Sequence, residues 1–145
     1  MTTNDLTLAP QALVRRSPLH RQHLSMGASL IQFGLGMLPD VYGNPTTDRA
    51  HVEHLGLVDL CLMPRAGYKG SGSTEFLQEF SLVSPNLPNR AAQQANGMLV
   101  NQLSYDEYLL IDTSLVPSRL ITTMAKAWSL DDVPDCYQVP RQDSH

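Results

Sequence analysis

The sequence from Met98 to Ile111, MLVNQLSYDEYLLI, indicates the fold most clearly. Two apolar runs, Met98 to Leu103 and Tyr108 to Ile111, flank a short polar segment, Ser104 to Glu107. Apolar runs of strand length that are joined by a short polar turn are typical of a β-hairpin. We therefore expect an antiparallel pair of strands here, preceded by a turn-rich stretch at residues 84–97.

After the hairpin the pattern changes from strand to helix. Beyond Pro117, apolar side chains recur at the spacing of one helix face: Leu120, Ile121, Met124 and Trp128. This spacing predicts a helix whose apolar face is buried. The last stretch, Cys136 to His145, is a possible strand followed by a polar tail.

The middle of the chain predicts two strand segments and a helix. Val58 to Leu62 and Ala66 to Lys69 have the composition of strands, and Pro64 marks a break between them. A helix should follow, capped by Ser71 or Ser73. Its apolar residues are Phe76, Leu77 and Phe80.

The N-terminal part predicts a helix that begins at Ser17-Pro18, because serine is a good N-cap and proline suits the first helical position. Its apolar residues are Leu19, Leu24, Ala28 and Ile31. Residues 34–36 should end this helix, and residues 38–45 are expected to form a loop.

A second short helix is expected after that loop. Thr46 or Thr47 can cap it, Gly56 should end it, and Ala50 and Leu55 would face inward. Because helices and strands mix without regular alternation, we expect the α+β class, with helices packed on a small mixed or antiparallel sheet.

The expected organisation is a loose N-terminal tail at residues 1–16, followed by a single domain at residues 17–145. The 145 residues suffice for one domain. Ten basic and 14 acidic residues give a net charge of −4, which argues against a nucleic-acid partner. No apolar run approaches the roughly 20 residues of a membrane span, and no apolar segment follows Arg15 and Arg16, so we expect neither a membrane span nor a secretory signal.

Cysteine and histidine usage give weaker indications. Cys61 and Cys136 are far apart and match no metal-ligand spacing. Because we expect no secretory signal, we expect both to be reduced in a cytoplasm. The histidines form two pairs, His20 with His23 and His51 with His54. A small enzyme using these pairs would need a third or fourth metal ligand, and exposed helix surface is the simpler interpretation.

The glycine-rich sequence at residues 67–74, GYKGSGST, invites a comparison with phosphate-binding loops. In such loops Lys and Ser or Thr follow the last glycine and open the helix, whereas Lys69 precedes Gly70 and Gly72. A tight strand-to-helix turn is therefore the favoured interpretation. No Gly-x-Ser-x-Gly nucleophile motif is present.

Three blocks, at residues 17–43, 54–78 and 97–114, resemble in this order three blocks of the aminomethyltransferase family, which includes the T-protein of glycine cleavage. Residues 17–43 (SPLHRQHLSMGASLIQFGLGMLPDVYG) are similar to the opening of that family. Residues 54–78 (HLGLVDLCLMPRAGYKGSGSTEFLQ) resemble its next block. Residues 97–114 (GMLVNQLSYDEYLLIDTS) resemble the block with the active-site strand and its hairpin partner. The order of the blocks implies the N-terminal part of a folate-binding domain.

The departures from that family concern its active site. The resemblance places the family's catalytic Asp on Gly97, within the pair Asn96-Gly97. A carboxylate is needed there to stabilise developing positive charge, and glycine supplies none. A tyrosine wall of the folate pocket becomes Asn101. The resemblance therefore implies no catalytic residue in this chain.

Other positions complete the implied pocket. Met63 falls on a methionine that lines the folate pocket in the family, whereas the family's tryptophan is replaced by Leu35 or Gly36. The resemblance implies no metal ligands and a vestigial folate pocket at Met63, Asn96 and Asn101.

Within the family, three motifs are similar to gamma subunits of sarcosine oxidase: residues 62–72 (LMPRAGYKGSG), 88–90 (PNR) and 139–143 (VPRQD). This resemblance implies an accessory subunit of a heterotetrameric sarcosine or N-methyl amine oxidase of one-carbon metabolism. Flavins, NAD and tetrahydrofolate would be held by larger flavoprotein subunits. A stand-alone folate-binding module, with little or no transferase activity, is the alternative. The family would continue past residue 143, so a shortened C-terminus is expected.

Overall fold

The computed structural model describes residues 15–34, 36–114 and 119–140. Its internal contacts divide the chain between Leu62 and Met63 into two compact units. We call residues 15–62 the N-terminal unit and residues 63–140 the C-terminal unit. The single domain expected at residues 17–145 stays a prediction, and most of the expected tail lies outside the described residues.

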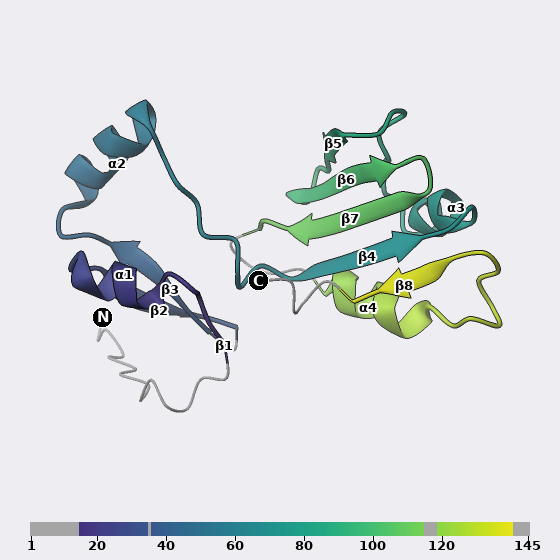
Figure 1. Cartoon of the computed structure of the whole chain (residues 1–145), viewed down its shortest axis with the longest axis horizontal. Coiled ribbons are helices and arrows are strands. Elements are labelled where there is room, and N and C mark those ends of the chain that lie inside the picture. The colour runs from purple at the N-terminus through teal and green to yellow at the C-terminus, as the bar shows by residue number, and fades with distance from the viewer. Residues whose placement is uncertain (1–14, 35, 115–118, 141–145) are drawn as a thin grey trace. The chain divides into compact units, whose positions relative to one another are not determined.

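The N-terminal unit consists of a small three-stranded sheet and two helices (Figure 1). Its elements are β1 (Arg15–Arg16), α1 (His20–Ser25), β2 (Ser29–Phe33), β3 (Gly36–Val41) and α2 (Pro45–His54). The strand order is β1-β3-β2, with β1 parallel and β2 antiparallel to β3. Since Arg15 and Arg16 pair with β3, the chain is ordered slightly before the predicted start at residue 17.

The predicted long N-terminal helix is wrong beyond Ser25, and the predicted loop at residues 38–45 is wrong in its first half. Residues 29–41 form the β2–β3 hairpin instead. Gly27 has φ +78°, a left-handed conformation that ends α1 and redirects the chain into β2. The apolar spacing fitted a helix face, but this backbone reversal separates the residues into a helix and a strand.

The second predicted helix exists as α2, with a different cap. The Asn44 side chain accepts hydrogen bonds from the backbone amides of Thr46 (2.9 Å) and Thr47 (3.4 Å). Ala50 and Leu55 were predicted to face inward, but both are exposed, and no residue of α2 is buried. The predicted strand at residues 58–62 has no strand structure.

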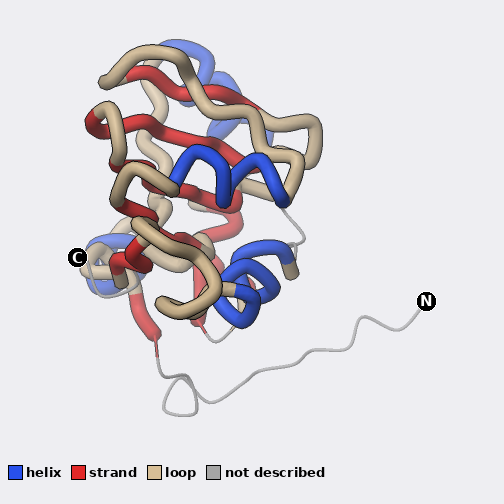
Figure 2. The backbone as a smooth tube through the Cα atoms, turned by 90° about the vertical axis from the view of Figure 1, so that its right-hand side faces the viewer, coloured by secondary structure: helices blue, strands red, loops and turns tan. Residues whose placement is uncertain are grey.

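The C-terminal unit is a five-stranded antiparallel sheet with two helices. Its elements are β4 (Arg65–Lys69), α3 (Ser73–Glu79), β5 (Arg90–Gln93), β6 (Met98–Ser104), β7 (Glu107–Asp112), α4 (Leu120–Ala127) and β8 (Tyr137–Val139). The strand order is β5-β6-β7-β4-β8. The predicted hairpin is confirmed as β6–β7, and the predicted C-terminal helix and strand are confirmed as α4 and β8. Figure 2 shows loops (tan) that connect the strands (red) and the helices (blue) of the described chain.

An apolar core holds the C-terminal unit together. Alternate residues of β6 and β7 are buried, as expected for an antiparallel sheet with one face packed on the core. The core side chains come from strands β4, β6 and β7, from helices α3 and α4, and from flanking segments: Ala66, Tyr68, Phe76, Leu77, Leu82, Met98, Val100, Tyr108, Leu110, Ile121, Met124 and Cys136. The predicted α+β class is confirmed. In the described part of the chain, no helix is long and apolar enough to cross a membrane.

Candidate functional site

The expected pocket residues lie around the start of β6. Met63 is half-buried and stands two residues before β4, while Asn96 is exposed in the turn between β5 and β6. The sheet register brings these two segments to the same end of the sheet, because the Asp112 amide donates to the Pro64 carbonyl (2.9 Å) and Asp112 lies opposite Met98. Asn101 lies further along β6.

Both asparagines are engaged by backbone groups. The Asn96 side chain accepts a hydrogen bond from the Met98 amide at 3.1 Å, which fixes the turn into β6. The Asn101 side-chain amide donates to the Leu109 carbonyl of β7 at 3.0 Å. These contacts give both residues a role in the hairpin, and neither supplies a charge.

The backbone at Gly97 is specialised for a turn. Gly97 has φ +86°, and its amide donates to the Gln94 carbonyl at 3.0 Å. Its own carbonyl accepts from the Thr113 hydroxyl. A Cβ atom built on Gly97 would meet only ordinary contacts, the nearest being Ser114 Cβ at 3.6 Å. A side chain is therefore opposed by backbone strain and not by lack of space.

The sequence patterns did not predict that Asp112, next to this turn, is a buried carboxylate. Asp112 at the end of β7 is 1% exposed and accepts hydrogen bonds from the amide (3.1 Å) and the hydroxyl of Ser114. The alternation of Tyr108, Leu110 and Asp112 along β7 is the signal that could have indicated its burial. The structure shows it ordering the chain after β7.

A second polar cluster lies in the N-terminal unit. The hydroxyl of Tyr42 and Nδ1 of His23 are 2.6 Å apart, and His23 Nε2 lies 3.3 Å from Asp59 Oδ2. Asp59 also accepts a hydrogen bond from the Cys61 amide at 2.9 Å. Burial raises the pKa of Tyr42, and the neighbouring carboxylates of Asp59 and Asp48 raise it further. The cluster therefore keeps the phenol protonated and joins α1, the end of β3 and the segment after α2.

The Asp59 carboxylate is the centre of this cluster. Burial pushes its pKa upward, but hydrogen bonds from Cys61, Ser17 and His23 outweigh burial and lower the pKa to about 2. Its side chain is only 5% exposed. A carboxylate that is this well hydrogen-bonded remains ionised, and here it stabilises the arrangement of three segments.

Metal binding by the histidine pairs finds no support in the geometry. His23 contacts Tyr42 and Asp59, as described above. His51 and His54 lie on α2, where all side chains around them are exposed. Among the residues that the structure describes, no group of three or more His, Cys, Asp or Glu side chains is arranged to hold a metal.

The glycine-rich turn before α3 serves packing. A Cβ atom on Gly70 would lie 2.1 Å from the Asp135 carbonyl oxygen, and one on Gly72 would lie 2.4 Å from that of Pro134. The Gly72 amide donates to the Asp135 carbonyl at 3.0 Å. The glycines therefore allow the segment before β8 to pass directly over the turn, which fits the predicted tight turn.

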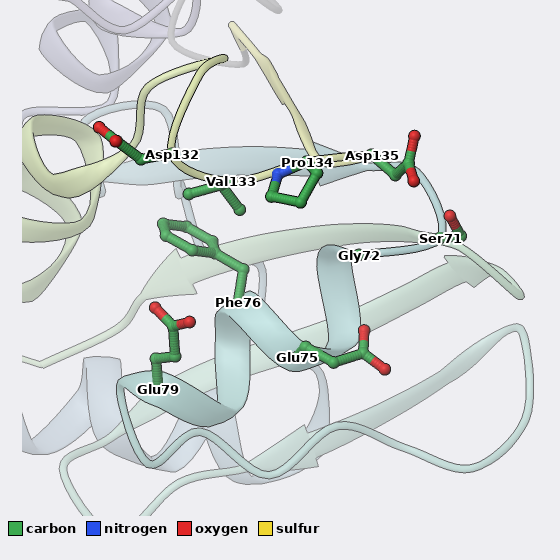
Figure 3. Close-up of a pocket in the computed structure, with 9 residues that line it drawn as sticks. All are labelled: Ser71, Gly72, Glu75, Phe76, Glu79, Asp132, Val133, Pro134 and Asp135. Carbon is green, nitrogen blue, oxygen red and sulfur yellow. The ribbon is translucent and has the colours of Figure 1, made fainter.

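A hollow of about 290 Å³ lies beside α3. It is lined by Ser71, Gly72, Glu75, Phe76, Glu79, Asp132, Val133, Pro134 and Asp135. Figure 3 shows Phe76 pointing toward Val133, with Asp132 and Asp135 extending away from each other. Since the carboxylates diverge, they do not surround a common point where a ligand charge could sit.

Comparisons with known proteins bear on the fold. No family model matches the chain. An aminomethyltransferase of Deinococcus deserti is 27% identical over 121 residues, covering 73% of this chain and 33% of the relative. The crystal structure of glycine cleavage system aminomethyltransferase T from Bartonella henselae matches with a TM-score of 0.53 and 15% identity, covering 86% of this chain and 37% of that chain.

The chain thus spans about a third of the length of the proteins that it matches. Its sequence relation to an aminomethyltransferase is weak, and the structural match shows the fold. The mixed α+β structure described above is similar to part of an aminomethyltransferase.

Proposed function

We propose that this chain is a non-catalytic, gamma-type accessory subunit of a heteromeric sarcosine or N-methyl amine oxidase. The observation that carries the proposal is Gly97. The position that the resemblance assigns to the catalytic carboxylate has no side chain and is held in a left-handed turn. The flavins and NAD would belong to larger partner subunits, in which the amine is oxidised.

The environment of Gly97 supports the same proposal. Asn96 and Asn101 make hydrogen bonds to the backbone of the hairpin and offer no charge to a developing cation. Asp112, the nearest carboxylate along the hairpin, is buried beside Ser114. Replacing only the glycine would therefore not rebuild a transferase site.

The test is purification of the full chain, carrying a tag, from its source cells. We expect it to bring down a larger protein that shows flavin absorbance and that oxidises sarcosine or another N-methyl amine. Activity assays of the same preparation with sarcosine and with other N-methyl amines would show which amine is the substrate. A monomeric protein without a flavoprotein partner would contradict the proposal.

A folate-binding module is the second candidate. The similarity to part of an aminomethyltransferase and the half-buried position of Met63 favour it. Calorimetric titration with tetrahydrofolate distinguishes the two candidates, because a folate module releases or absorbs heat in the absence of any partner. A titration without heat at millimolar folate would eliminate it. Met63→Ala serves as the control variant. It should weaken tetrahydrofolate binding if Met63 lines a folate pocket, and it should leave non-specific heat unchanged.

A further inference from the structure

The turn between β5 and β6 contains an asparagine that is directly followed by a glycine. Asn96 is the only asparagine of the sequence that precedes a glycine, and its side chain is exposed. An asparagine can react with its own backbone, because the amide nitrogen of the next residue can attack the side-chain carbonyl carbon and close a five-membered ring. Gly97 favours this attack, since it has no Cβ atom to obstruct it.

The Asn96 side chain is held in a position that suits this reaction. Its Oδ1 accepts a hydrogen bond from the Met98 amide at 3.1 Å. The ring that this hydrogen bond closes contains the Gly97 nitrogen, so the side-chain carbonyl stays close to that nitrogen. The Met98 N–H also stabilises the negative charge that develops on Oδ1 during the attack. One hydrogen bond therefore both orients and activates the carbonyl.

The Gly97 amide is engaged as well, which opposes the reaction. It donates to the Gln94 carbonyl at 3.0 Å, and this hydrogen bond must open before the nitrogen can lose its proton and attack. A single backbone hydrogen bond changes an equilibrium by about tenfold at most. The fold therefore slows the attack only modestly, and the hydrogen bond from Met98 acts in the opposite direction.

Asn44 provides a natural comparison within the same chain. Its side chain is also exposed and also accepts a hydrogen bond from the amide two residues further on, that of Thr46, at 2.9 Å. The next residue is Pro45, whose nitrogen carries no hydrogen and cannot become the attacking group. The two asparagines thus share their exposure and their hydrogen bond, and they differ in the nucleophile.

We propose that Asn96 is a site of spontaneous deamidation in the folded chain and that this reaction places a carboxylate beside Gly97. The Gly97 nitrogen loses its proton to water, a bond forms from this nitrogen to Asn96 Cγ, and the Cγ–Nδ2 bond breaks. Ammonia leaves with a proton from solvent, and a cyclic succinimide remains. Water then cleaves one of the two carbon–nitrogen bonds of the ring. In sum one water is consumed and one ammonium ion is released, so the reaction needs no oxidant or reductant.

Two products arise from the two ways in which the ring opens. Cleavage of the bond to Cγ gives aspartate, which can keep the hydrogen bond from the Met98 amide. Cleavage of the bond to the backbone carbonyl carbon gives isoaspartate. Isoaspartate adds one methylene group to the backbone of the turn that the Gln94 amide closes on the Met98 carbonyl at 2.8 Å. Either product adds one negative charge to a chain whose net charge is −4. All reacting protein atoms belong to residues 96 and 97, so the inference is independent of the proposed function.

The first experiment incubates the purified full chain at neutral and at mildly alkaline pH and follows each asparagine by mass spectrometry of its peptide. We expect Asn96 to deamidate at least about tenfold faster than Asn44. The rate should be higher at the alkaline pH, because the attacking nitrogen must lose its proton. Fragmentation of the peptide distinguishes isoaspartate from aspartate, and both should be found. Equal rates at Asn96 and Asn44, or a product without isoaspartate, would overturn the proposal.

The same chain unfolded in urea is the reference for the effect of the fold. We expect the Asn96 rate in the folded chain to lie within about tenfold of the rate in the unfolded chain, as the two opposing hydrogen bonds imply. A greater slowing would mean that the hydrogen bond to Gln94 protects the site, and it would refute deamidation as a property of the folded chain.

Two variants test the chemistry of the attack. Gly97→Ala places a methyl group beside the attacking nitrogen and should slow the reaction by about tenfold or more. Asn96→Gln keeps a side-chain amide but requires a six-membered ring, so it should also react at least about tenfold more slowly. Because Asn96→Gln leaves the glycine at φ +86° unchanged, it provides the test even where Gly97→Ala does not fold. An undiminished reaction at residue 96 in a folded variant would indicate direct hydrolysis of the amide and would rule out the proposed attack.

Discussion

The two units of this chain bury different kinds of side chains. In the C-terminal unit, Tyr68, Phe76, Leu77, Met98 and Leu110 are all 1% exposed or less. In the N-terminal unit, His23 and Asp59 form a buried polar cluster, and most large apolar side chains face solvent. Polar clusters order segments precisely, but they contribute little net stability compared with apolar burial. We therefore expect the C-terminal unit to be considerably more stable than the N-terminal unit.

The largest effect should come from a cavity in the C-terminal core. Leu110→Ala removes a fully buried side chain and should lower the free energy of unfolding by about 2–5 kcal/mol. The matched change in the N-terminal unit is Leu57→Ala, which truncates a side chain that is 87% exposed and should cost at most about 0.5 kcal/mol. Urea denaturation of both variants provides the measurement. Equal losses in the two variants would contradict the difference in burial between Leu110 and Leu57.

The next effect concerns the glycine turn of the C-terminal unit. Gly70→Ala places a Cβ atom 2.1 Å from the Asp135 carbonyl oxygen at φ +120°, and we expect a loss of about 3 kcal/mol. Gly27→Ala is the control in the N-terminal unit. At φ +78° it has no heavy atom within 4 Å of the new Cβ, so only the backbone strain of about 1 kcal/mol remains. Thermal unfolding of the two variants should rank them in this order.

Local patterns predicted the C-terminal unit better than the N-terminal unit, and the reason is physical. The β6–β7 hairpin and α4 depend on neighbours within about a dozen positions, so alternation and helical spacing reveal them. The same spacing suggested one long N-terminal helix. The left-handed backbone of Gly27 ends the helix instead, and the φ angle of a glycine cannot be predicted from its position in the sequence alone.

The candidate sites show the same limit. Gly97 was identified as a candidate position through the resemblance to a family. The burial of Asp112 was not predicted, because it depends on which face of β7 packs on the core. The cluster of His23, Tyr42 and Asp59 joins residues that are 19 and 36 positions apart. No local pattern links them, since long-range hydrogen bonds depend on how the segments pack.

Acid should affect the N-terminal unit through Asp59. Hydrogen bonds hold its folded-state pKa at about 2, below its ordinary value of 3.8. Its stabilisation is therefore complete above pH 3.8 and is lost as the pH falls toward about 2. Following the Cys61 amide by NMR, we expect a transition in this window, because that amide donates to Asp59. Asp59→Asn should abolish the transition and lower the free energy of unfolding by about 2 kcal/mol. Asp40→Asn, at an exposed position, should change neither the transition nor the free energy of unfolding. A transition that persists in Asp59→Asn would exclude this carboxylate as its cause.

The smallest effect tests the position on which the proposed function depends. Gly97→Asp introduces a carboxylate at the position to which the resemblance assigns a catalytic Asp, and the new Cβ has room beside Ser114 at 3.6 Å. The φ of +86° should cost about 1 kcal/mol, and Gly97→Ala should cost slightly more, because Asp tolerates left-handed backbone better than Ala. Urea denaturation measures this difference.

The same pair of variants separates charge from pocket in an aminomethyltransferase assay with tetrahydrofolate. A carboxylate acts only where surrounding groups hold the substrate in place. Since Asn96 and Asn101 are engaged by the hairpin backbone, we expect no turnover from Gly97→Asp or from Gly97→Ala. Turnover in Gly97→Asp alone would mean that the folate pocket is complete except for its charge. The chain would then be a transferase disabled at one position, and the proposed role of a non-catalytic accessory subunit would be contradicted.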